Sequence, residues 1–190
     1  MKANQAKEFE KNDYGVFLNA DASSLERFKM YETIVIDAQY FTKRDIELLH
    51  QNGTVVYTYL NIGSIENFRE YYTTYAELAI GEYEHWEEEE WVDVANPDWQ
   101  KFIGQLSQEL YEKGVDGFFI DNCDYIITIR TRVFLKVLQL FCKYLEACKA
   151  DGMEVYLLEY TTNPKLIQKI KEYCKEQDFH FYISSSLELR

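Results

Sequence analysis

Two carboxylates directly follow a strongly apolar segment in the middle of the chain. Residues 115–125 read VDGFFIDNCDY, so the apolar run from Gly117 to Ile120 ends at Asp121 and Asp124. An unpaired charge at the edge of a protein core costs several kcal/mol, and buried strands therefore rarely end in acids. Acids at a strand end are expected where that end opens onto a binding or catalytic face.

Phosphate and metal chemistries fit these acids poorly. A haloacid-type phosphotransferase needs Asp-x-Asp after its first strand, but the residue two positions after Asp121 is Cys123. A receiver-like phosphoacceptor needs a lysine at a later strand end, and LLEYTT at 157–162 contains none. A magnesium site at Asp121 and Asp124 stays open, although no phosphate-binding glycine loop accompanies it.

Sugar hydrolysis is the chemistry that remains. It needs two carboxylates facing each other across a cleft, one ionised and one protonated near neutral pH. Aromatic faces that stack on sugar rings also help, and the chain has 16 Tyr, 12 Phe and 3 Trp. Tyr40, Tyr59, Tyr125 and Tyr160 stand beside predicted strand ends. Half-buried tyrosines are common in any protein, so these residues support the interpretation without establishing it.

Six short apolar segments are predicted as strands, with longer amphipathic segments between them. The strands are rich in Val, Ile, Tyr and Phe and are apolar on both faces, as buried parallel strands are. They are expected at residues 14–20, 33–38, 54–62, 117–121, 154–160 and 179–185.

Helix signals fill the gaps between these strands. Thr42 caps a segment that stops at Gly53, and Asn96 with Pro97 opens one that ends at Gly114. Two further amphipathic segments follow at 132–152 and 163–177. The alternation predicts a single α/β domain, residues 1–190, with a parallel sheet.

Polar residues end every predicted strand. In a β/α barrel of the TIM type the carboxyl ends of all strands converge on one face and supply the active site, whereas an open doubly wound sheet binds ligands only near its switch point. The full set therefore favours a barrel-like arrangement. The strand-end residues are Asn19, Asp21, Asp37, Asn61, Asp121, Asp124, Glu159 and Ser184.

Charge and cysteine content limit the partners. The formal net charge is −13, which makes nucleic acid and anionic membrane surfaces poor partners and suits a neutral or cationic ligand. No segment has the roughly 20 apolar residues of a membrane span. The four cysteines form no CxxC pair and no zinc pattern, so we expect free thiols and neither metal nor cofactor. The amino terminus shows no signal peptide, which as it stands suggests the cytoplasm.

Four stretches together resemble a known family. YLNIGSIENFREYY (59–72), WVDVANPDWQKFI (91–103), GVDGFFIDNCDY (114–125) and VYLLEYT (155–161) are similar, in this order, to the endo-α-1,4-polygalactosaminidase-like glycoside hydrolases, which are TIM barrels. The resemblance covers residues 14 to about 125 and about 141 to 190. It implies hydrolysis of α-1,4-linked galactosamine polymers, with Asp121 as the catalytic nucleophile, in a family whose members are often secreted.

The chain is shorter than a complete barrel of this kind. A full barrel has eight strands and typically about 250 residues, but here a single crossing joins GFFID to EVYLLEY, which matches the family's seventh strand. The fifth and sixth βα units are therefore expected to be missing, in a barrel of about six strands. The family's second catalytic carboxylate, a glutamate, should fall in that missing part.

The remaining strand-end residues complete the expected site. Glu159 is the best remaining candidate for the second catalytic acid, although it could equally support the site through hydrogen bonds. Substrate contacts are expected from Asn19, Asp37, Tyr59, Asn61, Asp124 and Tyr160.

The stretch GEYEHWEEEEWVDV at 81–94 is expected to be a loop. Its run Glu87 to Glu90 is typical of a solvated face, and the alternative is that it lies over the strand ends and attracts amine-bearing sugars. Trp86 and Trp91 could stack on sugar rings or pin the loop. None of the three histidines has metal-ligand spacing.

Two readings of function stay open from sequence. The first is a glycoside hydrolase acting on amino-sugar polymers through a shortened barrel. The second is a catalytically inactive sugar-binding remnant of the same family that kept the cleft and lost an acid. A homo-oligomer that covers exposed strand edges is compatible with either.

Overall fold

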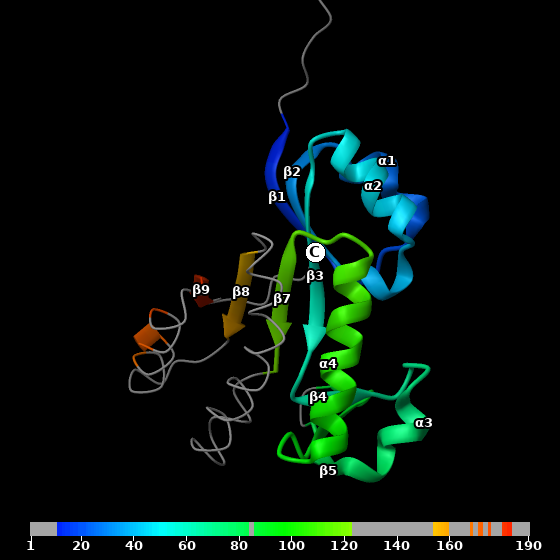
Figure 1. Ribbon diagram of the computed structural model, residues 1–190, viewed down its shortest axis with the longest axis vertical. Coiled ribbons are helices and arrows are strands. Elements are labelled where there is room, and N and C mark those ends of the chain that lie inside the picture. The colour runs from blue at the N-terminus through cyan, green and yellow to red at the C-terminus, as the bar shows by residue number, and fades with distance from the viewer. Residues whose placement is uncertain are drawn as a thin grey trace, which may run out of the picture.

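The computed structural model describes residues 11–83 and 86–122, the strand backbones 154–159 and 180–183, and residues 168, 171, 172 and 175 between these strands. Its main sheet contains six strands, all parallel, in the order β1-β2-β3-β7-β8-β9 (Figure 1). The strands are β1 (Asn12–Phe17), β2 (Tyr31–Ile36), β3 (Val55–Asn61), β7 (Gly117–Asp121), β8 (Glu154–Glu159) and β9 (His180–Ile183). All six strands predicted from sequence are present.

The order of the strands confirms the shortened barrel. β7 pairs directly with β8, from Gly117 opposite Glu154 to Ile120 opposite Leu157. Among the described strands, β1 and β9 stand at the two edges of the sheet and do not pair with each other. The fold is therefore α/β, an incomplete barrel of the TIM type with six strands among the described residues. The crossover predicted between β7 and β8 lies outside the described residues.

In the described part of the chain three α-helices flank the sheet, and the second and third of them begin where the sequence signals predict. They are α1 (Leu25–Phe28), α2 (Lys43–Gln51) and α4 (Pro97–Glu112), and the 3₁₀ turns Ala22–Ser24 and Ala38–Tyr40 precede α1 and α2. Thr42 and Asp45 form a reciprocal capping box at the start of α2. Asn96 caps α4, with Pro97 in its first turn. No helix in this described part is long and apolar enough to cross a membrane.

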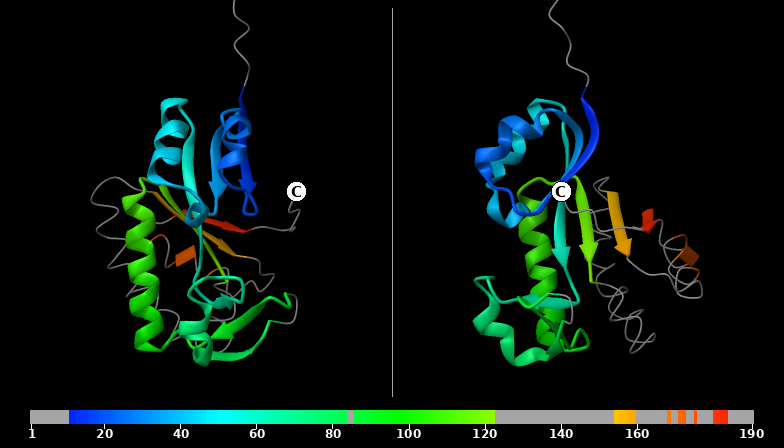
Figure 2. Two further views of the ribbon diagram at one scale, coloured as in Figure 1. Left: turned by 90° about the vertical axis from the view of Figure 1, so that its right-hand side faces the viewer. Right: turned by 180° about the vertical axis from the view of Figure 1, so that it is seen from behind.

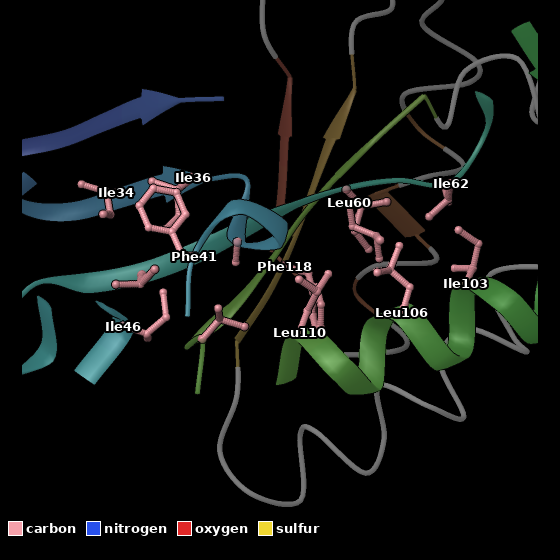
Figure 3. Close-up of a cluster of buried hydrophobic side chains, with 14 of the residues drawn as sticks. Ile34, Ile36, Phe41, Ile46, Leu60, Ile62, Ile103, Leu106, Leu110 and Phe118 are labelled. Atoms are coloured by element: carbon pink, nitrogen blue, oxygen red, sulfur yellow. The ribbon is translucent and has the colours of Figure 1, made fainter. Parts of the chain in front are cut away.

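The hydrophobic core lies between the helices and one face of the sheet. Alternate residues of β2, β3 and β7 point toward α2 and α4, because successive side chains of a strand point to opposite faces. Leu60 and Phe118 meet Leu106 and Leu110 of α4 (Figure 3). Trp99 of α4 also donates a hydrogen bond to the Ile62 carbonyl, 3.0 Å away, which fixes α4 to the end of β3.

A second, smaller sheet is inserted between β3 and α4, and the sequence did not predict it. It is antiparallel, in the order β4-β6-β5, and lies beyond the carboxyl end of β3 (Figures 1 and 2). Its elements are β4 (Ser64–Glu66), α3 (Tyr72–Tyr75), the 3₁₀ turn Ala76–Leu78, β5 (Ala79–Glu82) and β6 (Glu89–Val92). Such short, acidic strands carry a weak hydrophobic pattern, so residues 81–94 were expected to be a loop.

Candidate active site

The inner face of the main sheet, opposite the helices, carries aromatic and polar side chains. Asn61 of β3 is the register partner of Asp121 of β7, so both point to the same face. Tyr59 lies on this face as well, two residues before Asn61. Asp37 follows the end of β2 by one residue and alternates onto the same side, because Val35 pairs with Tyr57. The carboxyl ends of three neighbouring strands therefore present polar groups together.

A buried arginine joins two acids beside these strand ends. Arg69 donates from Nη1 to Asp37 Oδ2 at 2.6 Å, and from Nε and Nη2 to the two Glu66 oxygens at 2.6 and 3.0 Å. All three side chains are at least nine-tenths buried. The pKa of Arg69 is raised by its hydrogen bonds to Glu66 and the charge of Asp37, which outweigh the opposing effect of burial. Arg69 is therefore a fixed cation between β2 and β4.

Tyr59 is a buried phenol surrounded by carboxylates. Only 5% of Tyr59 is exposed, and within residues 11–83 and 86–122 no hydrogen bond reaches its hydroxyl. Burial raises the pKa of Tyr59 well above its usual value, and the negative charges of Asp121, Glu66 and Glu89 raise it further. The hydroxyl is thus kept neutral, within range of the charges of three acids.

Glu89 reaches this group from β6 of the smaller sheet. Its Oε2 accepts hydrogen bonds from Ser64 Oγ at 2.5 Å, Asn122 Nδ2 at 3.0 Å and Asn61 Nδ2 at 3.4 Å. Asn61 in turn accepts the backbone N–H groups of Gly63 and Ser64. These contacts connect the ends of β3, β4, β6 and β7 through side chains that are each held by a partner.

The backbone around Asp121 adopts an uncommon conformation. Asn122 has a φ of 60°, and it is the one non-glycine residue with positive φ in the described part of the chain. This conformation is sparsely populated outside glycine, asparagine and aspartate, and such residues cluster at functional sites. Gly63 packs against it so closely that a Cβ at Gly63 would lie 2.0 Å from the Asn122 carbonyl oxygen. Asp121 Oδ1 accepts the Asn122 N–H at 2.8 Å.

The structure brings four of the sequence-predicted residues together and leaves one apart. Asp37, Tyr59, Asn61 and Asp121 share the inner face at the strand ends, as their positions predicted. Asn19 is exposed in the turn after β1 and makes no hydrogen bond with this group in the described residues.

The other predicted residues belong to later parts of the chain. Glu159 ends β8 and pairs in register with Ile183 of β9. Because β8 neighbours β7 in parallel, this strand end lies on the same side of the sheet as Asp121. The Glu159 side chain, Asp124 and Tyr160 lie outside the described residues, and their roles stay predictions.

Sequence reasoning missed five residues of the group. The spacing within NIGSIENFR contained the signal for two of them, since a glutamate and an arginine three residues apart pair readily. Glu89 was hidden in a run of four glutamates that is typical of a solvated face. The five are Ser64, Glu66, Arg69, Glu89 and Asn122.

The acidic stretch before α4 is divided between surface and site. Glu87 and Glu88 are exposed, as expected for a solvated face, but Glu89 and Glu90 are half-buried. The Glu90 carboxylate accepts the Tyr72 hydroxyl at 2.6 Å, which ties β6 to α3. The hydrogen bonds of Glu89 place this part of the segment at the strand ends, as the alternative to a solvated face expected.

The two tryptophans of this stretch differ in the same way. Trp91 is buried, with its ring 4.1 Å from that of Tyr83, so it pins the small sheet. Trp86 is 44% exposed and remains available as a stacking surface.

Within the described residues, no three His, Cys, Asp or Glu side chains are arranged to hold a metal ion.

Three solved structures share the fold at low sequence identity. The glycoside hydrolase domain of PelA from Pseudomonas aeruginosa has a TM-score of 0.58 at 14% identity, over 92% of this chain and 94% of that one. Ega3 from Aspergillus fumigatus, solved in complex with galactosamine, has a TM-score of 0.66 at 17% identity, over 96% and 80%. Amy13B from Eubacterium rectale has a TM-score of 0.66 at 12% identity, over 92% and 48%.

Sequence comparison gives the family directly. No curated protein matches the chain. The family model of glycoside-hydrolase family GH114, however, matches residues 2–135, which is more than half of the chain and includes every residue of the group from Asp37 to Asn122. The chain belongs to glycoside-hydrolase family GH114.

Proposed function

We propose that the protein hydrolyses α-1,4-linked galactosamine-type polysaccharide at the carboxyl ends of β3 and β7, with Asp121 as the catalytic carboxylate. The observation that carries this proposal is the convergence of Asp121, Glu66, Glu89 and the Tyr59 hydroxyl at one strand-end face. Glycosidases act through paired carboxyl groups at such a face.

Charge supports an amine-bearing sugar as the substrate. The group contains four acidic side chains, those of Asp37, Glu66, Glu89 and Asp121, against the guanidinium of Arg69 and the Lys113 ammonium, whose charge interacts with Asp37. A site with this excess of acids attracts the ammonium group of an unacetylated amino sugar, and salt weakens that attraction by screening the charges. The galactosamine bound to the fold relative Ega3 has this chemistry.

One observation favours the alternative of an inactive sugar-binding remnant. β7 pairs directly with β8, so the sheet lacks the strands on which the family resemblance places the second catalytic acid. If no other group protonates the leaving oxygen, the site binds the polymer and turns it over very slowly. The two functions differ in rate and share one binding face.

The experiment compares cleavage and binding on matched glycans. Reducing ends released from an α-1,4-linked galactosamine oligomer are measured beside those from its N-acetylated form, and binding of both is measured by calorimetry. Asp121→Asn is tested with Asp13→Asn as control, because Asp13 is exposed on β1 and loses the same charge. We expect cleavage of the unacetylated oligomer, abolished by Asp121→Asn and unchanged by Asp13→Asn.

The outcomes separate the two functions. Salt-sensitive binding without cleavage, weakened by Asp121→Asn, selects the inactive remnant. Full cleavage by the Asp121→Asn variant contradicts the role of Asp121. Absence of both binding and cleavage on either glycan contradicts the proposed substrate and leaves the family and fold unchanged.

A further inference from the structure

A glycosidase of the proposed kind needs a protonated carboxyl group beside the ionised Asp121. The oxygen of the leaving sugar must receive a proton as its bond to the anomeric carbon breaks. The carboxyl groups whose charges act on both Tyr59 and Asp121 in the described residues are those of Glu66 and Glu89. The proton donor is therefore sought between these two.

Glu66 is unsuited to donate a proton. Both of its carboxylate oxygens accept hydrogen bonds from Arg69, at 2.6 and 3.0 Å. A proton on either oxygen would displace a guanidinium N–H from a buried, bidentate pair, the strongest kind of hydrogen bond that a carboxylate makes. Glu66 is held as an acceptor, and its oxygens are turned toward Arg69.

Glu89 is held by one oxygen and leaves the other open. Oε2 accepts from Ser64, Asn122 and Asn61, and all three are neutral donors. In the described stretches 11–83 and 86–122, no hydrogen bond reaches the second oxygen, Oε1. Because a neutral carboxyl group still accepts hydrogen bonds at its carbonyl oxygen, Glu89 can keep these contacts while Oε1 carries a proton.

The surroundings of Glu89 favour that proton. Burial raises the pKa of Glu89, and the negative charges of Glu66 and Asp121 raise it further, against the hydrogen bonds from Ser64 and Asn122. These effects favour the protonated form of Glu89 beside the other acids of the group.

The position of Glu89 relative to Asp121 is fixed by the backbone. Asn122 follows Asp121 directly, and its positive φ turns its amide toward Ser64 and Glu89. Gly63, against which the Asn122 carbonyl packs, allows the two segments to approach. The acid on β6 is thus tied to both strands beside it, through Asn122, which follows Asp121, and through Asn61, the register partner of Asp121.

We propose that Glu89 is the general acid and base of this active site, an assignment that rests on the proposed function. Asp121 attacks the anomeric carbon, the glycosidic C–O bond breaks, and the departing oxygen takes its electron pair and the proton from Glu89 Oε1. A water then attacks the glycosyl ester, Glu89 takes the proton of that water, and Asp121 leaves as a carboxylate. The net reaction is hydrolysis, with both groups restored.

The test uses the leaving group to isolate proton donation. Wild type, Glu89→Gln and the control Glu90→Gln are assayed on an α-1,4-linked galactosamine oligomer and on a dinitrophenyl α-galactosaminide, whose leaving group needs no proton. Glu90 is the matched control, since it carries the same charge on the same strand and binds Tyr72 instead. Far-ultraviolet circular dichroism and urea unfolding verify that each variant folds.

We expect Glu89→Gln to lower kcat/KM on the oligomer by about 10²–10⁴-fold. On the aryl glycoside it should retain a rapid burst of dinitrophenolate, followed by slow turnover that azide restores, because azide attacks the ester without a base. If Glu89 had only a structural role, its replacement would lower kcat/KM equally on both substrates, and azide would not restore turnover. Glu90→Gln should behave as wild type.

The contrary results are distinct. Equal loss on both substrates, or no loss on either, overturns the assignment of Glu89 and leaves the proposed function standing. If Glu159→Gln gives this leaving-group pattern and Glu89→Gln behaves as wild type, the general acid is Glu159 on β8, and the assignment of Glu89 is wrong. A wild-type protein that cleaves neither substrate contradicts the proposed function itself, and the assignment of Glu89 with it.

Discussion

Gly63 is the position where the smallest change to the chain should do the most damage. Replacing it by alanine places a Cβ 2.0 Å from the carbonyl oxygen of Asn122. A real Cβ does not approach a neighbouring atom closer than 3.0 Å, so the two backbone segments must separate by about 1.0 Å. Neither segment has a flexible side chain at the contact that could give way instead.

Two hydrogen bonds oppose that separation and set the magnitude. Ile62 N donates to the Asp121 carbonyl at 3.4 Å, and Asn122 Nδ2 donates to Ser64 Oγ at 2.8 Å. Overpacking typically costs about 1–3 kcal/mol and a lost hydrogen bond about 1 kcal/mol, so Gly63→Ala should lower the free energy of unfolding by about 2–4 kcal/mol. A shift of this size next to Asp121 should also lower kcat/KM on the oligomer by about 10²-fold.

Gly63→Ala and the control Gly81→Ala are compared by urea unfolding and by the oligomer assay. Gly81 lies in the small sheet, and a Cβ added there meets no atom within 4 Å. The control should stay within about 0.5 kcal/mol of wild type, as surface substitutions do. If Gly63→Ala is as stable and as active as Gly81→Ala, the inference that Gly63 and Asn122 approach closely is wrong.

Two further predictions concern stability. Arg69→Met should lower the free energy of unfolding by about 3–5 kcal/mol, because it leaves two buried carboxylates without their cation. Burial already raises the pKa of Glu66 above its unfolded value although Arg69 lowers it, so removing Arg69 should raise the folded-state pKa further. The loss of stability should therefore be largest well above that pKa and should shrink as pH falls toward 4.5. Urea titrations at several pH values follow this change, and a pH-independent loss would contradict the pairing. Thr42→Ala should cost about 0.5–2 kcal/mol by removing the capping box with Asp45, whereas Thr73→Ala, exposed in α3, should change thermal unfolding little.

The strands and the strand-end face could be predicted because their signals are local. Apolar segments bounded by polar residues define the strands of a parallel sheet, and a barrel brings the ends of those strands together. Asp37, Asn61 and Asp121 were therefore placed correctly without any knowledge of their neighbours. The shortage of strands was equally visible, since one crossing separates β7 from β8 in the sequence and the two pair directly.

The second half of the site could not be predicted because it depends on a nonlocal contact. Glu89 and Glu87 have the same residue type in the same acidic run, and only pairing with β4 turns one toward Ser64. Arg69 acquires its role from Asp37, which lies 32 residues earlier in the chain. The positive φ of Asn122 follows from its packing against Gly63, which no local pattern announces.

The described polar group of the site is drawn from one continuous stretch of the chain, from Asp37 to Asn122, because the small sheet is inserted between β3 and α4 rather than supplied by a later strand. A recombination event that exchanges this stretch transfers the whole group in one step. A deletion downstream of Asn122 removes none of its members. The described group can therefore be transferred as a unit, independently of the βα units that follow it in the chain.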